Sequence, residues 1–139
     1  MGRFLAGAVN GRPIGWENAA NPSTIAFMID GGGSAISTGE AGHIPIDFDG
    51  EIIEVEMFAD QSGSITVDIW KDTYANFPPT DADSICGVNE PSISGATKMT
   101  DSTLTDWTTT VNAGDVLAFN VDSCATIERC TVKLTLNRT

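Results

Sequence analysis

The chain has 139 residues and a mass of 14.6 kDa, which is enough for one domain with its own hydrophobic core and too little for two domains of ordinary size. Nineteen acidic residues against seven basic residues give a formal net charge of −12. Such a protein is repelled by phosphate backbones and by anionic membrane surfaces, so we expect neither nucleic acid nor a membrane among its partners.

The first 22 residues predict an irregular arm that precedes a domain spanning residues 23–139. Glycine at every fourth or fifth position and two X-Pro steps interrupt any helix or strand of useful length. The arm is basic, because Arg3 and Arg12 precede the first acidic residue, Glu17. Its apolar side chains need a surface to lie against. The residues expected to bind a partner are Arg3, Phe4, Leu5, Val9, Arg12, Ile14 and Trp16.

The beginning of the chain does not read as a targeting signal. The apolar run FLAGAV after Arg3 has six residues, whereas the hydrophobic region of a secretory signal needs about 7 to 15. Ala6 stands where a myristoylation signal requires Ser or Thr. We therefore expect a protein made in the cytoplasm without an export signal.

From residue 24 onward the chain consists of short β runs separated by turn residues. The runs are TIAFMI (24–29), HIPIDF (43–48), EIIEVEMFA (51–59), ITVDIW (65–70), DWTTTV (106–111), DVLAFNV (115–121) and TIERCTVKLTLNR (126–138). Residues 81–105 have no sustained period, and a strand there cannot be placed. Short strands with frequent turns are typical of an all-β protein, and we expect an antiparallel β-sandwich that resembles a jelly roll.

Alternation within these runs predicts which side chains enter the core. Between residues 51 and 59, Ile53, Val55 and Met57 alternate with Glu54 and Glu56, so the apolar set should be buried. The same argument buries Ile65, Val67, Ile69, Cys130, Val132, Leu134 and Leu136.

The acidic stretch DFDGE contains Asp47, Asp49 and Glu51, which superficially resemble a calcium loop. The complete ligand spacing of such a loop is absent. The pair Asp49-Gly50 between two β runs is typical of a two-residue hairpin turn, which explains the acidic residue without a metal. We therefore expect no metal ion and no cofactor.

The sequence also lacks the residue sets of common enzymes. His43 is the only histidine, and neither a Gly-x-Ser-x-Gly elbow nor a phosphate-binding Gly-Lys-Ser/Thr loop occurs. A triad built on His43, or a pair of glycosidase carboxylates, finds little support in the surrounding residues. We expect a protein that is not an enzyme.

Three cysteines, Cys86, Cys124 and Cys130, cannot all pair within one chain. They could be three reduced and mostly buried thiols. Alternatively, Cys124 and Cys130 could form a bond across a turn, or the odd cysteine could form a disulfide between subunits.

The segment WKDTYANFPP places Trp70, Tyr74 and Phe77 within eight residues. These aromatic side chains either pack beneath their loop and cover one end of the domain, or lie exposed as a contact surface for sugars or proteins. We expect a corner of the sandwich, with a contact surface as the alternative.

Two long strings resemble a segment that recurs in virion proteins of tailed bacteriophages and related prophages. They run from MIDGGGSAISTGEAG to WKDTYANFPPT and from ATKMTDSTLTDWTT to VKLTLNRT, and cover roughly residues 27–139. The most specific parts are ADQSGSITVDIWKDTYANFPPT and AGDVLAFNVDSC. The resemblance implies a β-sandwich module on a surface protein of the particle, with a structural or adhesive role and no catalytic residues. Cys124 fits that pattern, whereas Cys86 and Cys130 depart from it.

Together, the arm and the resemblance predict a virion structural protein, namely a capsid decoration (cement) or head-fibre protein on the virion surface. Its expected partners are the major capsid protein or another virion protein, and further copies of itself, with a trimer favoured. The alternative is a tail-fibre or receptor-binding module that binds carbohydrate through Trp70, Tyr74 and Phe77.

Overall fold

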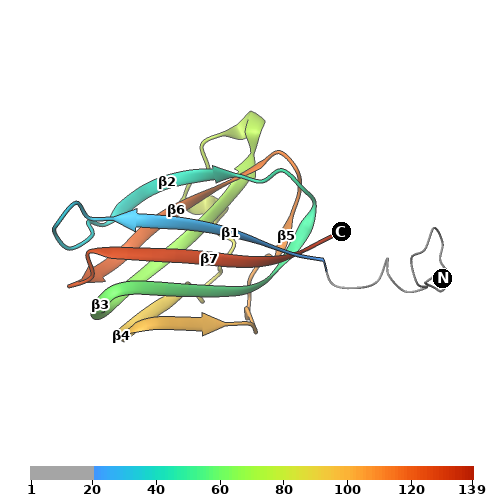
Figure 1. Cartoon of the computed structure of the whole chain (residues 1–139). Helices are drawn as coiled ribbons and strands as arrows, with labels where there is room; N and C mark the ends of the chain where they lie inside the picture. The colour runs from blue at the N-terminus through green and yellow to red at the C-terminus, as the bar shows by residue number, and fades with distance from the viewer. Residues whose placement is uncertain (1–20) are drawn as a thin grey trace, which may run out of the picture.

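The computed structural model describes residues 21–139, which form a curled antiparallel sheet of seven strands (Figure 1). The strands are β1 (Pro22–Asp30), β2 (Gly39–Pro45), β3 (Gly50–Thr73), β4 (Ser92–Asp101), β5 (Thr110–Val111), β6 (Asp115–Ala125) and β7 (Arg129–Arg138). Two single-turn 3-10 helices, η2 (Tyr74–Asn76) and η3 (Asp81–Asp83), follow β3. None of the helices within residues 21–139 has the length and apolar character needed to cross a membrane.

The expected all-β antiparallel class is confirmed. The strand order is β1-β7-β3-β6-β2, and β4 and β5 also pair with β3. Because hydrogen bonds join all seven strands in one sheet, the finer expectation of a jelly-roll-like sandwich is not confirmed.

β3 organises this sheet by turning back on itself. Residues 50–59 pair with β7 and residues 64–73 pair with β6, both antiparallel. Since β6 and β7 are consecutive strands of opposite direction, β3 can stay antiparallel to both only by reversing near residues 60–63. Figure 1 shows the two green halves of β3 meeting at the end of the molecule opposite the C-terminus. The two runs predicted as separate strands, 51–59 and 65–70, are therefore halves of one bent strand.

The bend of β3 is held against the turn between β6 and β7. Oδ1 of Asp60 accepts hydrogen bonds from the backbone N–H groups of Glu128, at 3.1 Å, and Arg129, at 3.0 Å. At Gly63 the two chain segments approach so closely that a Cβ would lie 2.6 Å from the carbonyl oxygen of Ala125. Asp60 and Gly63 thus allow the bend of β3 to pack closely against the turn between β6 and β7.

The core lies inside the curl of the sheet. All seven side chains predicted to be buried from the second half of β3 and from β7 are confirmed as buried. Phe119 of β6 is fully buried and stacks on Phe27 of β1, with ring centroids 4.8 Å apart. This contact joins β1, at one end of the strand order, to β6, which lies next to β2 at the other end.

The first half of β3 departs from simple alternation. Its register with β7 shifts between Ile52 and Glu54, which is a β-bulge. The bulge places Ile52, Val55 and Met57 in the core and leaves Ile53 40% exposed, so the prediction that Ile53 is buried is wrong.

The predicted hairpin at Asp49-Gly50 is also wrong, because β2 pairs with β6 and not with β3. Asp49 has a different task. Its carbonyl accepts a hydrogen bond from the N–H of Thr139, at 3.0 Å, and its Oδ1 accepts one from the N–H of Ala113, at 2.9 Å. Asp49 therefore joins the C-terminus to the loop between β5 and β6.

The arm meets the sheet slightly earlier than its predicted boundary after residue 22. β1 begins at Pro22, and the carbonyl of Asn21 already accepts a hydrogen bond from the N–H of Arg138, at 3.0 Å. The last two residues of the predicted arm thus belong to the sheet. β4 occupies residues 92–101, where alternation located no strand.

Replacing Gly63 with alanine should lower the free energy of unfolding by roughly 1 to 3 kcal/mol, because the added methyl group overpacks the bend against Ala125 and Ile127. Urea denaturation measures this loss. Ser62→Ala, at an exposed position of the same bend, is the matched control and should change stability by less than about 0.5 kcal/mol. An unchanged unfolding midpoint for G63A would show that the close approach does not constrain the fold.

Asp60→Asn should destabilise the protein at neutral pH, with a loss that shrinks in acid. The backbone N–H of Arg129, followed by that of Glu128, the Gln61 side chain and the Arg129 charge, holds the pKa of Asp60 below its ordinary value of 3.8. A lowered pKa in the folded state stabilises the protein above pH 3.8, and this contribution is lost as the pH falls through the folded-state pKa. Unfolding free energies measured along this pH range check the prediction. Asp47→Asn, at an exposed carboxylate, is the control, and the difference between its unfolding free energy and that of the wild type should not shrink in this way as the pH falls.

Candidate functional site

The structure separates the three aromatic residues that the sequence grouped. Trp70 is half-buried, and its Nε1–H donates a hydrogen bond to Asp68 at 2.9 Å. Phe77 is 48% exposed and contacts the edge of the His43 ring on β2, with centroids 4.7 Å apart. Tyr74 is 81% exposed. The expected cap of buried aromatics does not form, since Tyr74 is exposed, Phe77 is 48% exposed and only Trp70 is half-buried.

Tyr74 stands at the edge of an open groove with a volume of about 670 Å³. One wall is the end of β3 with η2, and the other is the segment from β5 to the start of β6. The lining residues are Lys71, Asp72, Thr73, Tyr74, Ala75, Thr110, Asn112, Ala113, Gly114 and Asp115. We call this hollow the Tyr74 groove.

Hydrogen bonds hold the two walls of the Tyr74 groove together. The backbone N–H of Tyr74 donates to the carbonyl of Gly114 at 3.0 Å, and Nζ of Lys71 donates to the carbonyl of Thr110. Thr73 pairs with Asp115 in the β3-β6 ladder. The walls are therefore fixed by the fold, although the Tyr74 ring itself is free.

The charges of the groove are acidic in balance. Lys71 forms an ion pair with Asp115 at 3.9 Å, and Oδ2 of Asp115 also accepts a hydrogen bond from the N–H of Asn112 at 2.9 Å. Asp72 accepts hydrogen bonds at Oδ1 from the N–H of Thr73 and from the side chain of Asn76, at 2.7 and 3.2 Å. Among the ion pairs of residues 21–139, none involves Asp72. The groove thus offers an aromatic face and a carboxylate with an unused oxygen.

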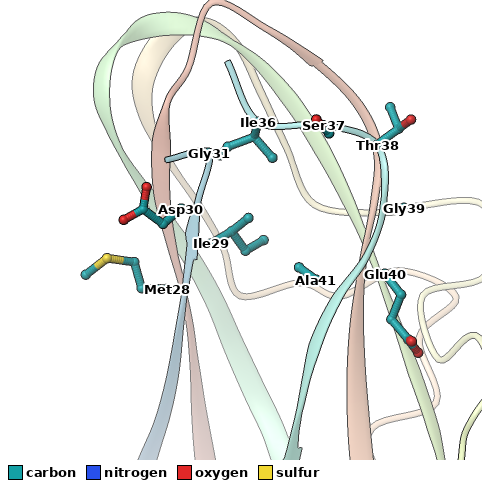
Figure 2. Close-up of a pocket in the computed structure, with 10 residues that line it drawn as sticks. All are labelled: Met28, Ile29, Asp30, Gly31, Ile36, Ser37, Thr38, Gly39, Glu40 and Ala41. Carbon is teal, nitrogen blue, oxygen red and sulfur yellow. The ribbon is translucent and has the colours of Figure 1, made fainter. Parts of the chain in front are cut away.

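A second hollow, of about 250 Å³, lies between the end of β1 and the start of β2 (Figure 2). Figure 2 shows Asp30 and Glu40 on opposite sides of it. Both carboxylates already have partners, because Asp30 accepts a hydrogen bond from the N–H of Gly32 at 2.8 Å and Glu40 lies 3.0 Å from Nε2 of His43. The two acids therefore do not form a free acid and base pair for hydrolysis.

The carboxylates of Asp68, Glu90 and Asp122 form a third cluster, with oxygens within 4.8 Å of one another. Hard cations such as Ca²⁺ take oxygen ligands of this kind. Hydrogen bonds already satisfy the buried member, since Asp68 accepts them from Trp70 and, at 2.6 Å, from the hydroxyl of Ser84. These bonds account for the buried carboxylate of Asp68. Among residues 21–139, these three carboxylates lie close enough together to resemble a metal-binding group. Asp47, Asp49 and Glu51 do not.

The three cysteines are free thiols. Cys124 and Cys130 flank the turn between β6 and β7, as a bond between them requires, but they are not joined. Cys86 and Cys130 are fully buried, so neither can reach a neighbouring subunit while the domain is folded. Of the three alternatives for the cysteines, the burial of Cys86 and Cys130 favours reduced and buried thiols.

The predicted arm residues lie outside residues 21–139, and the structure describes none of them. These are Arg3, Phe4, Leu5, Val9, Arg12, Ile14 and Trp16. The second wall of the Tyr74 groove was missed by sequence reasoning, because NAGD (112–115) carries only a turn signal and nothing in it reveals which segment it packs against.

No family model, curated protein or solved structure matches this chain.

The thiols should react slowly in the folded protein. Burial raises the pKa of Cys130 to about 11 and also raises the pKa values of Cys86 and Cys124. At pH 8 only about one Cys130 in a thousand is then a thiolate, the form that attacks disulfide reagents. Titration with a chromogenic disulfide reagent should show no fast thiol in native protein and three in denaturant. Cys124→Ser identifies any slow native reaction as that of Cys124, and two or more fast native thiols would contradict the burial of Cys86 and Cys130.

Proposed function

We propose that the protein is a non-enzymatic structural component of a bacteriophage particle. It decorates the capsid, as a cement or head-fibre protein, and attaches through its N-terminal arm to the major capsid protein or another virion protein. The proposal rests on the resemblance to virion surface modules that we expect from the sequence of residues 27–139. A domain with its own core and an acidic balance of charge is compatible with it.

One geometric observation carries the choice of a decoration protein. Because β3 turns back, both its beginning and its end lie at the end of the sheet where Asn21 joins β1. Asp49 links the two sites directly, since it binds the C-terminal Thr139 beside β1 and Ala113 in the Tyr74 groove. The Tyr74 groove therefore lies at the same end of the sheet as Asn21, whereas we would expect the binding tip of a receptor-binding module at the opposite end.

The junction between arm and domain is suited to anchoring. The N–H of Asn21 donates to Oδ1 of Asn137 at 2.7 Å, and the N–H of Arg138 donates back to the carbonyl of Asn21. β1 then pairs with β7 along its whole length of nine residues. A force applied along the direction of β1 would load this whole ladder at once.

A tail-fibre or receptor-binding module is the second candidate. The 81% exposure of Tyr74 and the 48% exposure of Phe77 favour it, because exposed aromatic side chains are common anchors in binding sites. In either position, assembly of several copies, with a trimer proposed, would add weak contacts through avidity.

Deleting residues 2–20 should abolish attachment to particles while leaving the domain folded. The measurement is cryo-electron microscopy of particles assembled with the full-length or the truncated protein, with circular dichroism as the check on folding. Tyr74→Ala in the full-length chain is the control and should attach normally. Density on the shell that vanishes with residues 2–20 supports a decoration protein. Density at the tail tip, or attachment without the arm, contradicts it.

A further inference from the structure

We propose that the Tyr74 groove binds a neutral sugar unit of a glycan. The first argument is the Tyr74 ring, which is 81% exposed although the backbone beneath it is held to Gly114 at 3.0 Å. The ring buries little area in the fold, and the backbone that carries it is fixed. A sugar presents one face of C–H groups, which an aromatic face of this kind can cover.

The second argument is the polar lining beside the ring. Both hydrogen bonds that Asp72 accepts end at Oδ1. Among residues 21–139, no hydrogen bond reaches its Oδ2. Asn112, an exposed residue with a side-chain amide, also lines the groove. A carboxylate oxygen and an amide are well matched to the hydroxyl groups around a sugar ring, which both donate and accept hydrogen bonds.

The third argument is charge, which selects the class of sugar. Lys71 is the lysine of the groove, and it is engaged by Asp115 and by the carbonyl of Thr110. An anionic ligand, such as a sialylated or sulfated glycan, would meet Asp72 without a free cation to offset the repulsion. An apolar ligand would leave the polar groups of the lining unpaired. A neutral saccharide satisfies both constraints.

The fourth argument is preorganisation. The walls are joined by backbone and side-chain hydrogen bonds, so binding does not need to order them, and the volume of about 670 Å³ lies within the range of roughly 300 to 1,000 Å³ of ligand pockets. The inference does not depend on where the protein sits on a particle.

The test is a titration of the full-length ¹⁵N-labelled protein followed by NMR. The probes are the methyl glycosides of glucose, galactose, mannose and N-acetylglucosamine at millimolar concentration, with sialyllactose as the anionic comparison. We expect at least one neutral glycoside to shift the amides of residues 71–75 and 110–115, and sialyllactose to bind more weakly. Tyr74→Ala should weaken binding about tenfold or more, whereas Tyr74→Phe, which keeps the ring, should retain most of it. Val88→Ala, at a side chain that is 83% exposed and outside the lining, is the control and should bind like the wild type.

Absence of shifts with every neutral probe, shifts confined to another part of the domain, equal binding by Tyr74→Ala, or preference for sialyllactose would each overturn the proposal. Deleting residues 2–20 tests one other occupant of the groove. If that deletion alone moves the amides of residues 71–75 and 110–115, the basic arm and not a sugar occupies the groove. This result is separate from particle attachment, so either proposal can fail without the other.

Discussion

The reversal of β3 is the constraint on which the rest of the molecule depends. A strand of 24 residues would extend far beyond a small domain if it ran straight, at about 3.3 Å per residue. Asp60 and Gly63 instead fit its middle to the β6-β7 turn, so that one half pairs with β7 and the other with β6. The sheet curls around the apolar side chains of both halves because of this bend.

The same reversal creates the Tyr74 groove. The second half of β3 must end opposite the beginning of β6, where Thr73 pairs with Asp115. Tyr74, the residue after β3, then lies beside the loop that precedes β6, and its N–H donates a hydrogen bond to the carbonyl of Gly114. Tyr74 is thus positioned by long-range pairing, while its side chain is left out of the core. A binding surface at this place needs no structure beyond the one that closes the sheet.

The sequence predicted local features well where one face of a strand meets a regular core. Alternation found the buried faces of β7 and of the second half of β3, because each apolar residue there is two positions from the next. It failed at Ile53, where a bulge inserted one residue and exchanged the faces. It also failed at Asp49-Gly50, whose turn chemistry is satisfied by Thr139 and Ala113, segments far away in the chain. Predicting these features requires knowing which strands pair, and this information is not contained in any short window.

The candidate site, like the strand pairing, could not be predicted from a short stretch of sequence. The exposed Tyr74 lay in the aromatic segment that the sequence singled out, but its partners in the groove come from residues 110–115, which have no chemical signature of their own. The groove and the junction at Asn21 share one end of the sheet, because Asp49 binds Ala113 of the groove and Thr139, which follows the Arg138 that bonds to Asn21. A domain anchored through its arm would therefore hold the groove near its base.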